Sequence, residues 1–585
     1  MFKGSGDKVT DPARFFLEPS NPTHRQYEAL RAYYVDHLPS AQAAARFGYT
    51  PGSFRVLCHK FLKDPDRRFF AAPKQTGAPL PDPPDPVRDR VIELRKQNLS
   101  IYDISDTLKR SGRSLSPVAA SLILKQAGFA KLPRRRDDER VGLSISAAKV
   151  ADCRDLDLSE RQFRTKFGGL FLFLPLLAAM PFDHIMDKAG LPGSAMVQAG
   201  HAMRSLLALK LFGSARRSHV MADVFDEGLG LFAGLNVIPK RSFLTEYSCR
   251  IDPACYPNLM RLWFDAIGQL GLKRGTSFDL DFHTIPFHGE DALVEKHYVS
   301  KRSRRQKGIL AFLARDADRR VFCYANAEIR RGEQNDEILR FIEFWKKRTG
   351  RLPEELVFDS KLTTYGHLSK LNQMGIVFTT LRRRTRPLLQ QIHTQPLSAW
   401  RRVQLDSVSR EYKTPRVLDQ SIELAGYQGP IRQLCVTELG HEEPTLILTN
   451  QLRKSPAKII ERYAKRMLIE NGIADGVDFY HMDALSSAVA MKINCDLQLT
   501  LMASSLYRLL ASRIAEGYET ATSNRIFRDF IDATALVTIN KQTITVTFAK
   551  RAHNPLLRAA GFHQTDLPIP WLEGRRLRID LGEPD

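Results

Sequence analysis

The sequence lacks the cysteine spacing of a zinc ribbon or of a disulfide-linked domain. Its seven cysteines are an odd number, and no two of them are separated by two residues. An apolar signal-peptide core is also missing from Met1 to Asp7. The longest apolar run, Gly168 to Phe182, is too short to span a bilayer and contains Pro175. We therefore expect a protein of a reducing cytoplasm with no membrane partner.

Positive charge is in excess. Lysine and arginine together number 87 against 65 aspartates and glutamates, which gives a net charge of +22 and a pI near 9.7. Such a chain repels itself unless a polyanion neutralises it, so double-stranded DNA is the first partner to consider. The alternative is a basic protein whose charge serves only solubility. The 585 residues suffice for several domains, and 43% of them are hydrophobic, as is ordinary for a folded protein.

Residues 1–72 have the pattern of a helix-turn-helix unit. A capping box of Thr23 and Gln26 predicts a first helix that ends near Val35. Ser40 would cap a short helix that ends before Gly48, and Thr50-Pro51 would start the next, to Leu62. Residues 73–86 contain six prolines and predict a semi-rigid linker.

Residues 87–140 repeat this pattern. Val87 to Gln97 predicts an amphipathic helix, Ser100 and Asp103 form a second capping box, and Ser116-Pro117 starts a helix that ends at Gln126. A run of arginines follows and could contact a phosphate backbone: Arg134, Arg135 and Arg136. The alternative is a small helical bundle that binds protein.

The rest of the chain predicts a multidomain α/β protein. Residues 141–270 indicate a helical region that connects domains or dimerises. Residues 271–520 predict three strands of a meander, then helix, strand, helix and strand, which is the order of a ribonuclease H-like mixed sheet. Residues 383–450 predict a β-rich insertion, with strands at 402–405, 421–425, 434–438 and 445–448. A single long helix should follow Ser455-Pro456, and residues 521–585 predict a C-terminal tail with short strands.

Three carboxylates stand out in residues 271–520. The strand Thr276 to Phe282 alternates, with Asp279 and Asp281 on its polar face, although aspartate is disfavoured in central strands. Asp359 ends an apolar strand, and Glu470 falls on the apolar stripe of the long helix, where a charge needs a partner or a metal. Each also has an ordinary interpretation, as a turn residue, a cap or a glutamate that reaches solvent at a helix end.

Three such carboxylates could bind two Mg²⁺ ions about 3.5–4 Å apart, an arrangement that cuts phosphodiesters by in-line attack. Two basic runs in the same region could hold a DNA backbone. The first, residues 301–307, includes Arg304, Arg305 and Lys307, and the second consists of Arg382, Arg383 and Arg384.

These segments resemble bacterial insertion-sequence transposases of the Asp-Asp-Glu class. One group in this class marks its third carboxylate with Tyr-x2-Arg-x3-Glu-x6-Lys, and this sequence has Tyr463, Arg466 and Glu470 in that spacing. The resemblance covers roughly residues 270–520. It also includes the segments Asp281 to Pro286, Leu356 to Ser360, Gly375 to Phe378, Ile447 to Asn450 and Ile459 to Arg462.

The resemblance implies a ribonuclease H-like core that uses Mg²⁺ or Mn²⁺, two ions per site, with Asp281, Asp359 and Glu470 as ligands. Tyr463 and Arg466 would contact phosphates near the cut. From its place on the strand, Asp279 would orient the metal ligands, as His283 could, and the alternative is that Asp279 binds the metal and Asp281 caps the turn towards Pro286. It further implies a homodimer or higher oligomer that pairs the inverted-repeat ends of a mobile element, in the cytoplasm of a bacterium and associated with its nucleoid. Val477 stands where the group has its lysine, which leaves a hairpin or another cleavage route open.

Two alternatives remain. One is a catalytically inactive descendant of a transposase that regulates by binding DNA. The other is a different ribonuclease H-like nuclease or integrase. The tandem helix-turn-helix pattern and the Tyr-Arg-Glu helix favour the transposase. The terminal-repeat sequence and the target preference do not follow from these residues.

Overall fold

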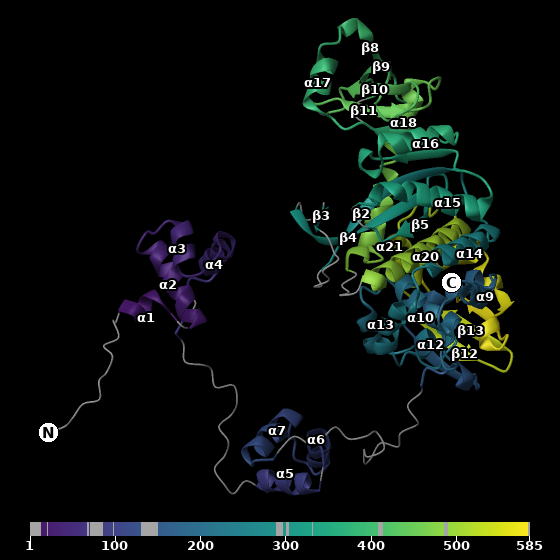
Figure 1. The fold of residues 1–585 in the computed structure, drawn as a ribbon. Helices are drawn as coiled ribbons and strands as arrows, with labels where there is room; N and C mark the ends of the chain where they lie inside the picture. The colour runs from purple at the N-terminus through teal and green to yellow at the C-terminus, as the bar shows by residue number, and fades with distance from the viewer. Residues whose placement is uncertain are drawn as a thin grey trace. The chain divides into compact units, whose positions relative to one another are not determined.

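A computed structural model describes residues 13–19, 21–66, 69–70, 86–97, 99–129, 150–287, 296–299, 304–329, 332–406, 413–440, 442–484 and 490–582 (Figure 1). Contacts within the chain divide it into two units, Met1–Ser144 and Ile145–Asp585. Each unit is described by itself below.

The first unit is entirely helical where the structure describes it. Helix α1 spans Ala13–Leu17, and α2 (Pro22–Tyr34), α3 (Ser40–Arg46) and α4 (Pro51–Lys63) pack around Phe54 and Leu57. Thr50 caps α4 as predicted, and Gly48 makes the turn before it with φ 71°. The predicted cap at Thr23 is wrong, because Asn21 receives the hydrogen bond from the Thr23 backbone nitrogen.

The second set of helices has its own core of Val91, Leu94, Ile104 and Leu108. It consists of α5 (Pro86–Lys96), α6 (Ile101–Arg110) and α7 (Pro117–Gln126). Both hydrogen bonds of the predicted capping box between Ser100 and Asp103 are present, at 2.9 and 3.2 Å. The arginine run Arg134, Arg135 and Arg136 lies outside the described residues.

The larger unit contains a mixed sheet in the region where the sequence predicts one. Its strands are β2 (Ser277–Pro286), β4 (Arg304–Asp316), β5 (Val321–Asn326), β6 (Glu355–Phe358) and β7 (Val377–Leu381). They lie in the order β5-β4-β2-β6-β7. The β2–β4 and β4–β5 pairs are antiparallel, whereas β2–β6 and β6–β7 are parallel. The first strand of the meander is therefore central, and the parallel strands continue the sheet on its other side.

Helices cover this sheet. Phe341 and Trp345 of α15 (Glu337–Thr349) contact the ring of Phe278 on β2. Gln498 of α20 (Ala490–Ile514) donates a hydrogen bond to the backbone oxygen of Ala325 on β5. Helix α16 (Tyr365–Gln373) connects β6 to β7. Strand β3 (Lys296–Val299) pairs with the beginning of β4, past the carboxyl end of β2.

The β-rich insertion continues the same sheet instead of forming a separate one. Its strands are β8 (Trp400–Arg402), β9 (Arg416–Ile422), β10 (Ile431–Thr437) and β11 (Thr445–Thr449), and α17 (Arg386–His393) precedes them. Strand β11 pairs antiparallel with β7, so the order runs on as β7-β11-β10-β9-β8. The sequence located these strands to within a few residues but gave no sign of the shared sheet or of α17.

A second sheet joins the two ends of the larger unit. Strand β1 (Arg161–Thr165) pairs with β12 (Ala535–Ile539), and the order continues as β13, β15 and β14. The bounds of these last strands are Thr543–Phe548, Arg576–Asp580 and Asp566–Pro568. The short strands predicted for residues 521–585 are present, β13 among them.

The helices between β1 and β2 match the helical pattern predicted there: α8 (Leu174–Ala178), α9 (Phe182–Lys188), α10 (Ala199–Leu211), α11 (Val220–Asp223), α12 (Glu227–Ala233), α13 (Arg241–Arg250) and α14 (Cys255–Gln269). Near the C-terminus are α21 (Ser523–Ile526) and α22 (Asn554–Ala559). Among the described residues, no single helix has the length and apolarity to cross a membrane. One bent pair, 168–178 with 182–188, meets that test together.

Candidate active site

Two of the predicted aspartates lie at the same level on neighbouring parallel strands. Leu280 on β2 is the last residue paired with β6, opposite Phe358. Asp281 and Asp359 each follow that pair by one residue. Because neighbouring strands are about 4.8 Å apart, the register brings these two aspartates side by side at the carboxyl end of β6. Asp279 is paired with Val357, one pleat earlier.

Asp281 has two hydrogen-bond donors and two nearby like charges. Its Oδ1 accepts from the Phe282 backbone nitrogen at 2.9 Å, and its Oδ2 accepts from Arg466 Nη2 at 3.2 Å. Burial raises the pKa of the Asp281 carboxyl; Arg466 opposes the rise, and Asp359 and Glu470 add to it. Both other predicted carboxylates are therefore near enough to affect Asp281.

Asp359 is half-buried and begins a short 3₁₀ turn, Ser360–Leu362. Its Oδ1 accepts a hydrogen bond from the Ser360 backbone nitrogen at 2.6 Å. The apolar strand before it is buried on both sides, with Leu356, Val357 and Phe358 inaccessible to solvent. A rigid strand thus delivers this carboxylate to the edge of the sheet.

The predicted single helix after Ser455 is two helices. Helix α18 (Pro456–Lys465) ends at Arg466, and α19 (Leu468–Asp478) begins after Met467. The joint is held by hydrogen bonds to the third preceding residue, such as Glu470 N to Met467 O at 3.1 Å. Glu470 lies in the first turn of α19, where a negative charge is favourable.

Glu470 does not lie on an inward-facing stripe, so that prediction is wrong. Glu470 is exposed and Met467 is 48% exposed, whereas the buried apolar residues between 456 and 470 are Ile459, Ile460 and Ile469. The break rotates α19 relative to the stripe extrapolated from α18. Glu470 is still near enough for its charge to add to the rise in the pKa of Asp281.

Tyr463 and Arg466 lie beside the three carboxylates. Arg466 is only 6% exposed, and its Nε has no hydrogen-bond partner among the described atoms. Its guanidinium carbon is 5.9 Å from the centre of the Tyr463 ring. Burial raises the pKa of the Tyr463 hydroxyl, and the charges of Asp359, Asp281 and Glu470 act in the same direction. A buried cation with a spare donor therefore lies next to the carboxylates.

Asp279 and His283 contact residues that the sequence analysis did not single out. Asp279 is 1% exposed, and its two oxygens lie 2.8 Å from Arg462 Nη1 and 3.6 Å from Arg315 Nη1. His283 Nε2 lies 2.7 Å from Asp483 Oδ1. Arg462 could have been found from the sequence, since it stands four residues before Arg466. Asp483 and Arg315 give no such signal.

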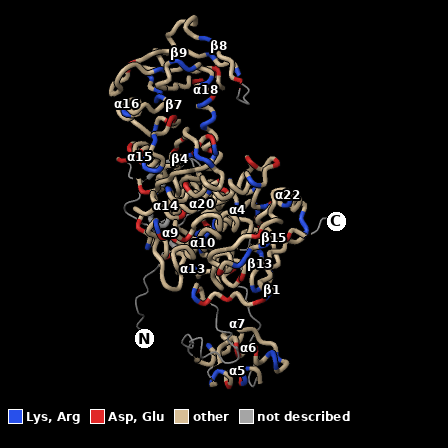
Figure 2. The backbone as a smooth tube through the Cα atoms, turned by 90° about the vertical axis from the view of Figure 1, so that its right-hand side faces the viewer, with Lys and Arg blue, Asp and Glu red and all other residues tan. Residues whose placement is uncertain are grey.

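The predicted basic residues lie at different distances from the aspartates. Arg382 follows β7 at the same edge of the sheet as Asp359, and it donates to Gln433 Oε1 at 2.6 Å. Arg383 and Arg384 are exposed beyond it. Figure 2 marks lysines and arginines along the backbone, several of them in the part that carries β8, β9 and α18.

The other basic run lies farther along the sheet. Lys307 is exposed on β4, six residues before Leu313, the partner of Asp281. It therefore lies roughly 20 Å along the strand from Asp281. Arg304 and Arg305 are the first two residues of the same strand, and the structure does not describe their side chains.

The side-chain types suit a divalent cation, since Mg²⁺ takes carboxylate oxygens and water. Within the described ranges, however, no three histidine, cysteine, aspartate or glutamate side chains converge as a ready-made metal cluster. Arg466 and the Phe282 backbone hold Asp281 instead. Val477, where the lysine was expected, packs against the main hydrophobic core.

Comparisons with known proteins were made by sequence and by structure. No family model matches the chain, and no curated protein matches it. Among solved structures, the chain is similar to the piggyBac transposase synaptic complex with hairpin DNA, at 12% identity and a TM-score of 0.32, covering 62% of this chain and 84% of that one. It is also similar to a pre-cleavage Mos1 transpososome, at 9% identity and a TM-score of 0.13, covering 63% and 80%. Neither score supports an argument about this chain.

Proposed function

We propose that this protein is a transposase that cuts and joins DNA strands at the ends of its own mobile element, with a divalent metal. The observation that supports this most is the register of β2 on β6, which sets Asp281 level with Asp359. Glu470 is close enough to raise the pKa of Asp281. Two aspartates on adjacent strands and one glutamate on a helix are the residue types and elements expected for two-metal phosphodiester chemistry.

In this proposal, Asp281, Asp359 and Glu470 would hold Mg²⁺ or Mn²⁺, two ions per site. When bound, the ions would activate the attacking hydroxyl and stabilise the leaving oxygen. Arg466 would exchange the Asp281 carboxylate for a DNA phosphate, to which its Nε, unpaired among the described atoms, could donate a hydrogen bond. The ring of Tyr463 would pack against the guanidinium of Arg466. Arg383 and Arg384 would lie along the DNA backbone.

The partners follow from the same chemistry. The two three-helix sets of the first unit would bind the terminal inverted repeats, because each presents a capped helix after a tight turn. Pairing two ends of one element requires at least two copies of the chain, so a homodimer or higher oligomer would form on the DNA.

The test is cleavage of DNA that carries the inverted repeats flanking the reading frame, with Mg²⁺ or Mn²⁺ and with a chelator. Glu470→Gln preserves shape but removes the charge that a metal needs, so we expect cleavage to fall at least about 100-fold. DNA binding should survive, because the helices of the first unit, and not Glu470, would bind the terminal repeats. The control is Glu519→Gln, another exposed glutamate, which should cut at the wild-type rate.

Two results would contradict the proposal. Cleavage by Glu470→Gln at the wild-type rate would mean that the third carboxylate is misassigned. Specific DNA binding by the wild-type chain without any metal-dependent cutting would favour the DNA-binding regulator instead.

A further inference from the structure

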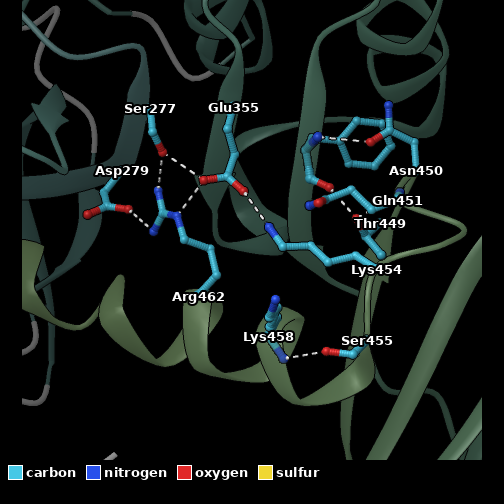
Figure 3. Close-up of polar contacts among 11 residues, drawn as sticks. Ser277, Asp279, Glu355, Thr449, Asn450, Gln451, Lys454, Ser455, Lys458 and Arg462 are labelled. Atoms are coloured by element: carbon cyan, nitrogen blue, oxygen red, sulfur yellow. Dashed lines mark hydrogen bonds and ion pairs between the residues drawn. The ribbon is translucent and has the colours of Figure 1, made fainter. Parts of the chain in front are cut away.

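The side chain of Arg462 on α18 uses all three of its guanidinium nitrogens (Figure 3). Nη1 donates to Asp279 Oδ1 at 2.8 Å, Nη2 to Ser277 Oγ at 2.8 Å, and Nε to Glu355 Oε2 at 2.5 Å. The Ser277 hydroxyl donates to the same Glu355 oxygen at 2.7 Å. The side chains of Arg462, Glu355 and Asp279 are only 14%, 15% and 1% exposed. These contacts form a largely buried network.

The network joins one helix to the two strands that carry the aspartates. Ser277 and Asp279 are on β2, and Glu355 is paired with Ser277 from β6. Asp281 follows two residues after Asp279, and Asp359 four residues after Glu355. The contacts of Arg462 therefore hold α18 against both strands at once.

The spacing of charges on the helix matches the spacing on the strand. Arg462 and Arg466 are four residues apart, which is about 6 Å along a helix. Asp279 and Asp281 are two residues apart, which is about 6.6–7 Å along a strand. Arg462 contacts Asp279 at 2.8 Å, and Arg466 contacts Asp281 at 3.2 Å. The two arginines of the helix are therefore spaced to pair with the two aspartates of the strand.

Other contacts anchor the start of α18. Lys454 Nζ lies 3.7 Å from Glu355 Oε1, and Ser455 Oγ accepts from the Lys458 backbone nitrogen at 3.4 Å (Figure 3). Arg462 secures the last turn of the helix, directly before Tyr463. Helix α19 and Glu470 continue from that turn.

We propose that Arg462 is a positioning residue that fixes the register of α18 on β2 and β6. It thereby sets where Arg466 and Glu470 lie relative to Asp281 and Asp359. This inference rests on the proposed function, because its consequence is a rate of DNA cleavage. A shift of α18 by one residue would move Glu470 by about 1.5 Å, and a misplacement of about 1 Å can cost a hundredfold in rate.

The experiment uses the full chain with Arg462→Lys and Arg462→Met. Lysine keeps the charge but lacks the planar fork that reaches three partners. We expect the cleavage rate of saturating end DNA to fall about 100-fold in Arg462→Met and at least about tenfold in Arg462→Lys. The Kd for the same DNA should stay within about twofold of wild type, because Arg462 faces the sheet.

Arg217→Met is the matched control. Arg217 Nη2 lies 2.5 Å from Asp496 Oδ1, and the two side chains are 14% and 15% exposed, as in the pair of Arg462 with Glu355. This variant should lower the unfolding temperature, while the protein that remains folded should cut at the wild-type rate. If Arg217→Met loses as much stability as Arg462→Met but keeps the wild-type cleavage rate, the slower cleavage by Arg462→Met is due to lost positioning and not to lost stability.

Equal cleavage rates for folded Arg462→Lys, folded Arg217→Met and the wild type would overturn the inference and leave the transposase proposal intact. If the wild-type chain cuts no DNA, the proposed function fails, and amide hydrogen exchange then decides the register of the helix. Faster exchange over residues 463–470 in Arg462→Lys, but not in Arg217→Met, would support the positioning role. Unchanged exchange there would overturn it.

Discussion

Asp279 and Asp281 are identical residues on one face of one strand, yet their surroundings differ. Asp279 is enclosed between Arg462 and Arg315, which leaves it no access to a ligand from solvent. Asp281 keeps 19% of its side chain exposed and has one arginine, Arg466, on one oxygen. The difference follows from position, because Asp281 lies just past the last β2–β6 pair and Asp279 lies within the paired region.

Single Asp→Asn variants test this difference. We expect Asp281→Asn to abolish Mn²⁺-supported cleavage, because it removes a charge that a metal needs. Asp279→Asn should keep measurable cleavage but lower the free energy of unfolding by about 3 kcal/mol, since it leaves buried guanidinium groups short of a counter-ion. Cleavage assays with end binding as the control, together with urea unfolding, would measure both. The opposite ranking of cleavage would identify Asp279 as the ligand.

At the scale of elements, local patterns in the sequence found the strands but not their partners. Alternation around Phe278 and the apolar run before Asp359 predicted β2 and β6, because each pattern is contained in a few residues. The pairing of β11 with β7 joins residues more than 60 positions apart, so no local pattern indicates it. Short-range rules therefore identified the meander but missed that the insertion extends the sheet.

Glu470 shows the same limit within a helix. The predicted apolar stripe runs without interruption across residues 466–467, where α18 ends and α19 begins. No glycine or proline marks that break; tertiary contacts of Arg462 and Arg466 accompany it instead. The motif spacing pointed to Glu470, while the argument from burial failed.

The contact between two irregular helical segments makes Gly169 a sensitive position. It lies in the 3₁₀ segment Gly168–Phe173, and a Cβ there would be 2.1 Å from the backbone oxygen of Ile531, at the end of the π-helical turn Phe527–Ile531. Backbone cannot move aside as a side chain can. We expect Gly169→Ala to lower the free energy of unfolding by about 2–3 kcal/mol in urea.

Gly268 provides the matched control within a regular helix. It lies in α14, and a Cβ there would meet nothing within 4 Å. Gly268→Ala should therefore raise the free energy of unfolding by up to about 1 kcal/mol, from helix propensity. If both substitutions had the same effect, the close approach at Gly169 would not be the cause.

At the scale of the whole molecule, the net charge of +22 should govern DNA binding. Each phosphate neutralised by lysine or arginine releases counter-ions, so the affinity for a duplex with the terminal repeats should fall with salt. We expect the Kd of the full chain to rise roughly 10³-fold or more between 50 mM and 200 mM salt. Fluorescence anisotropy over that range would measure the slope. A Kd independent of salt would exclude phosphate contacts as the main source of affinity.

The pH dependence of stability should report a histidine in the core of the larger unit. His201 is 8% exposed, and burial lowers its pKa to about 4; the charge of Arg204 acts in the same direction, and Asp183 opposes it. Unfolding returns the pKa to about 6.5, so below that pH the unfolded chain binds the extra proton. Stability should therefore be complete above pH 6.5 and fall as the pH drops towards 4.

The loss is at most about 3 kcal/mol, from a difference of roughly 2.5 pKa units. Replacing the imidazole with an amide that does not titrate, His201→Gln, should flatten this part of the curve, even if the variant is less stable at every pH. Urea midpoints measured between pH 4 and pH 7.5 would test it. A wild-type slope preserved in His201→Gln would assign the pH dependence to other groups, because every other titrating side chain is unchanged in that variant.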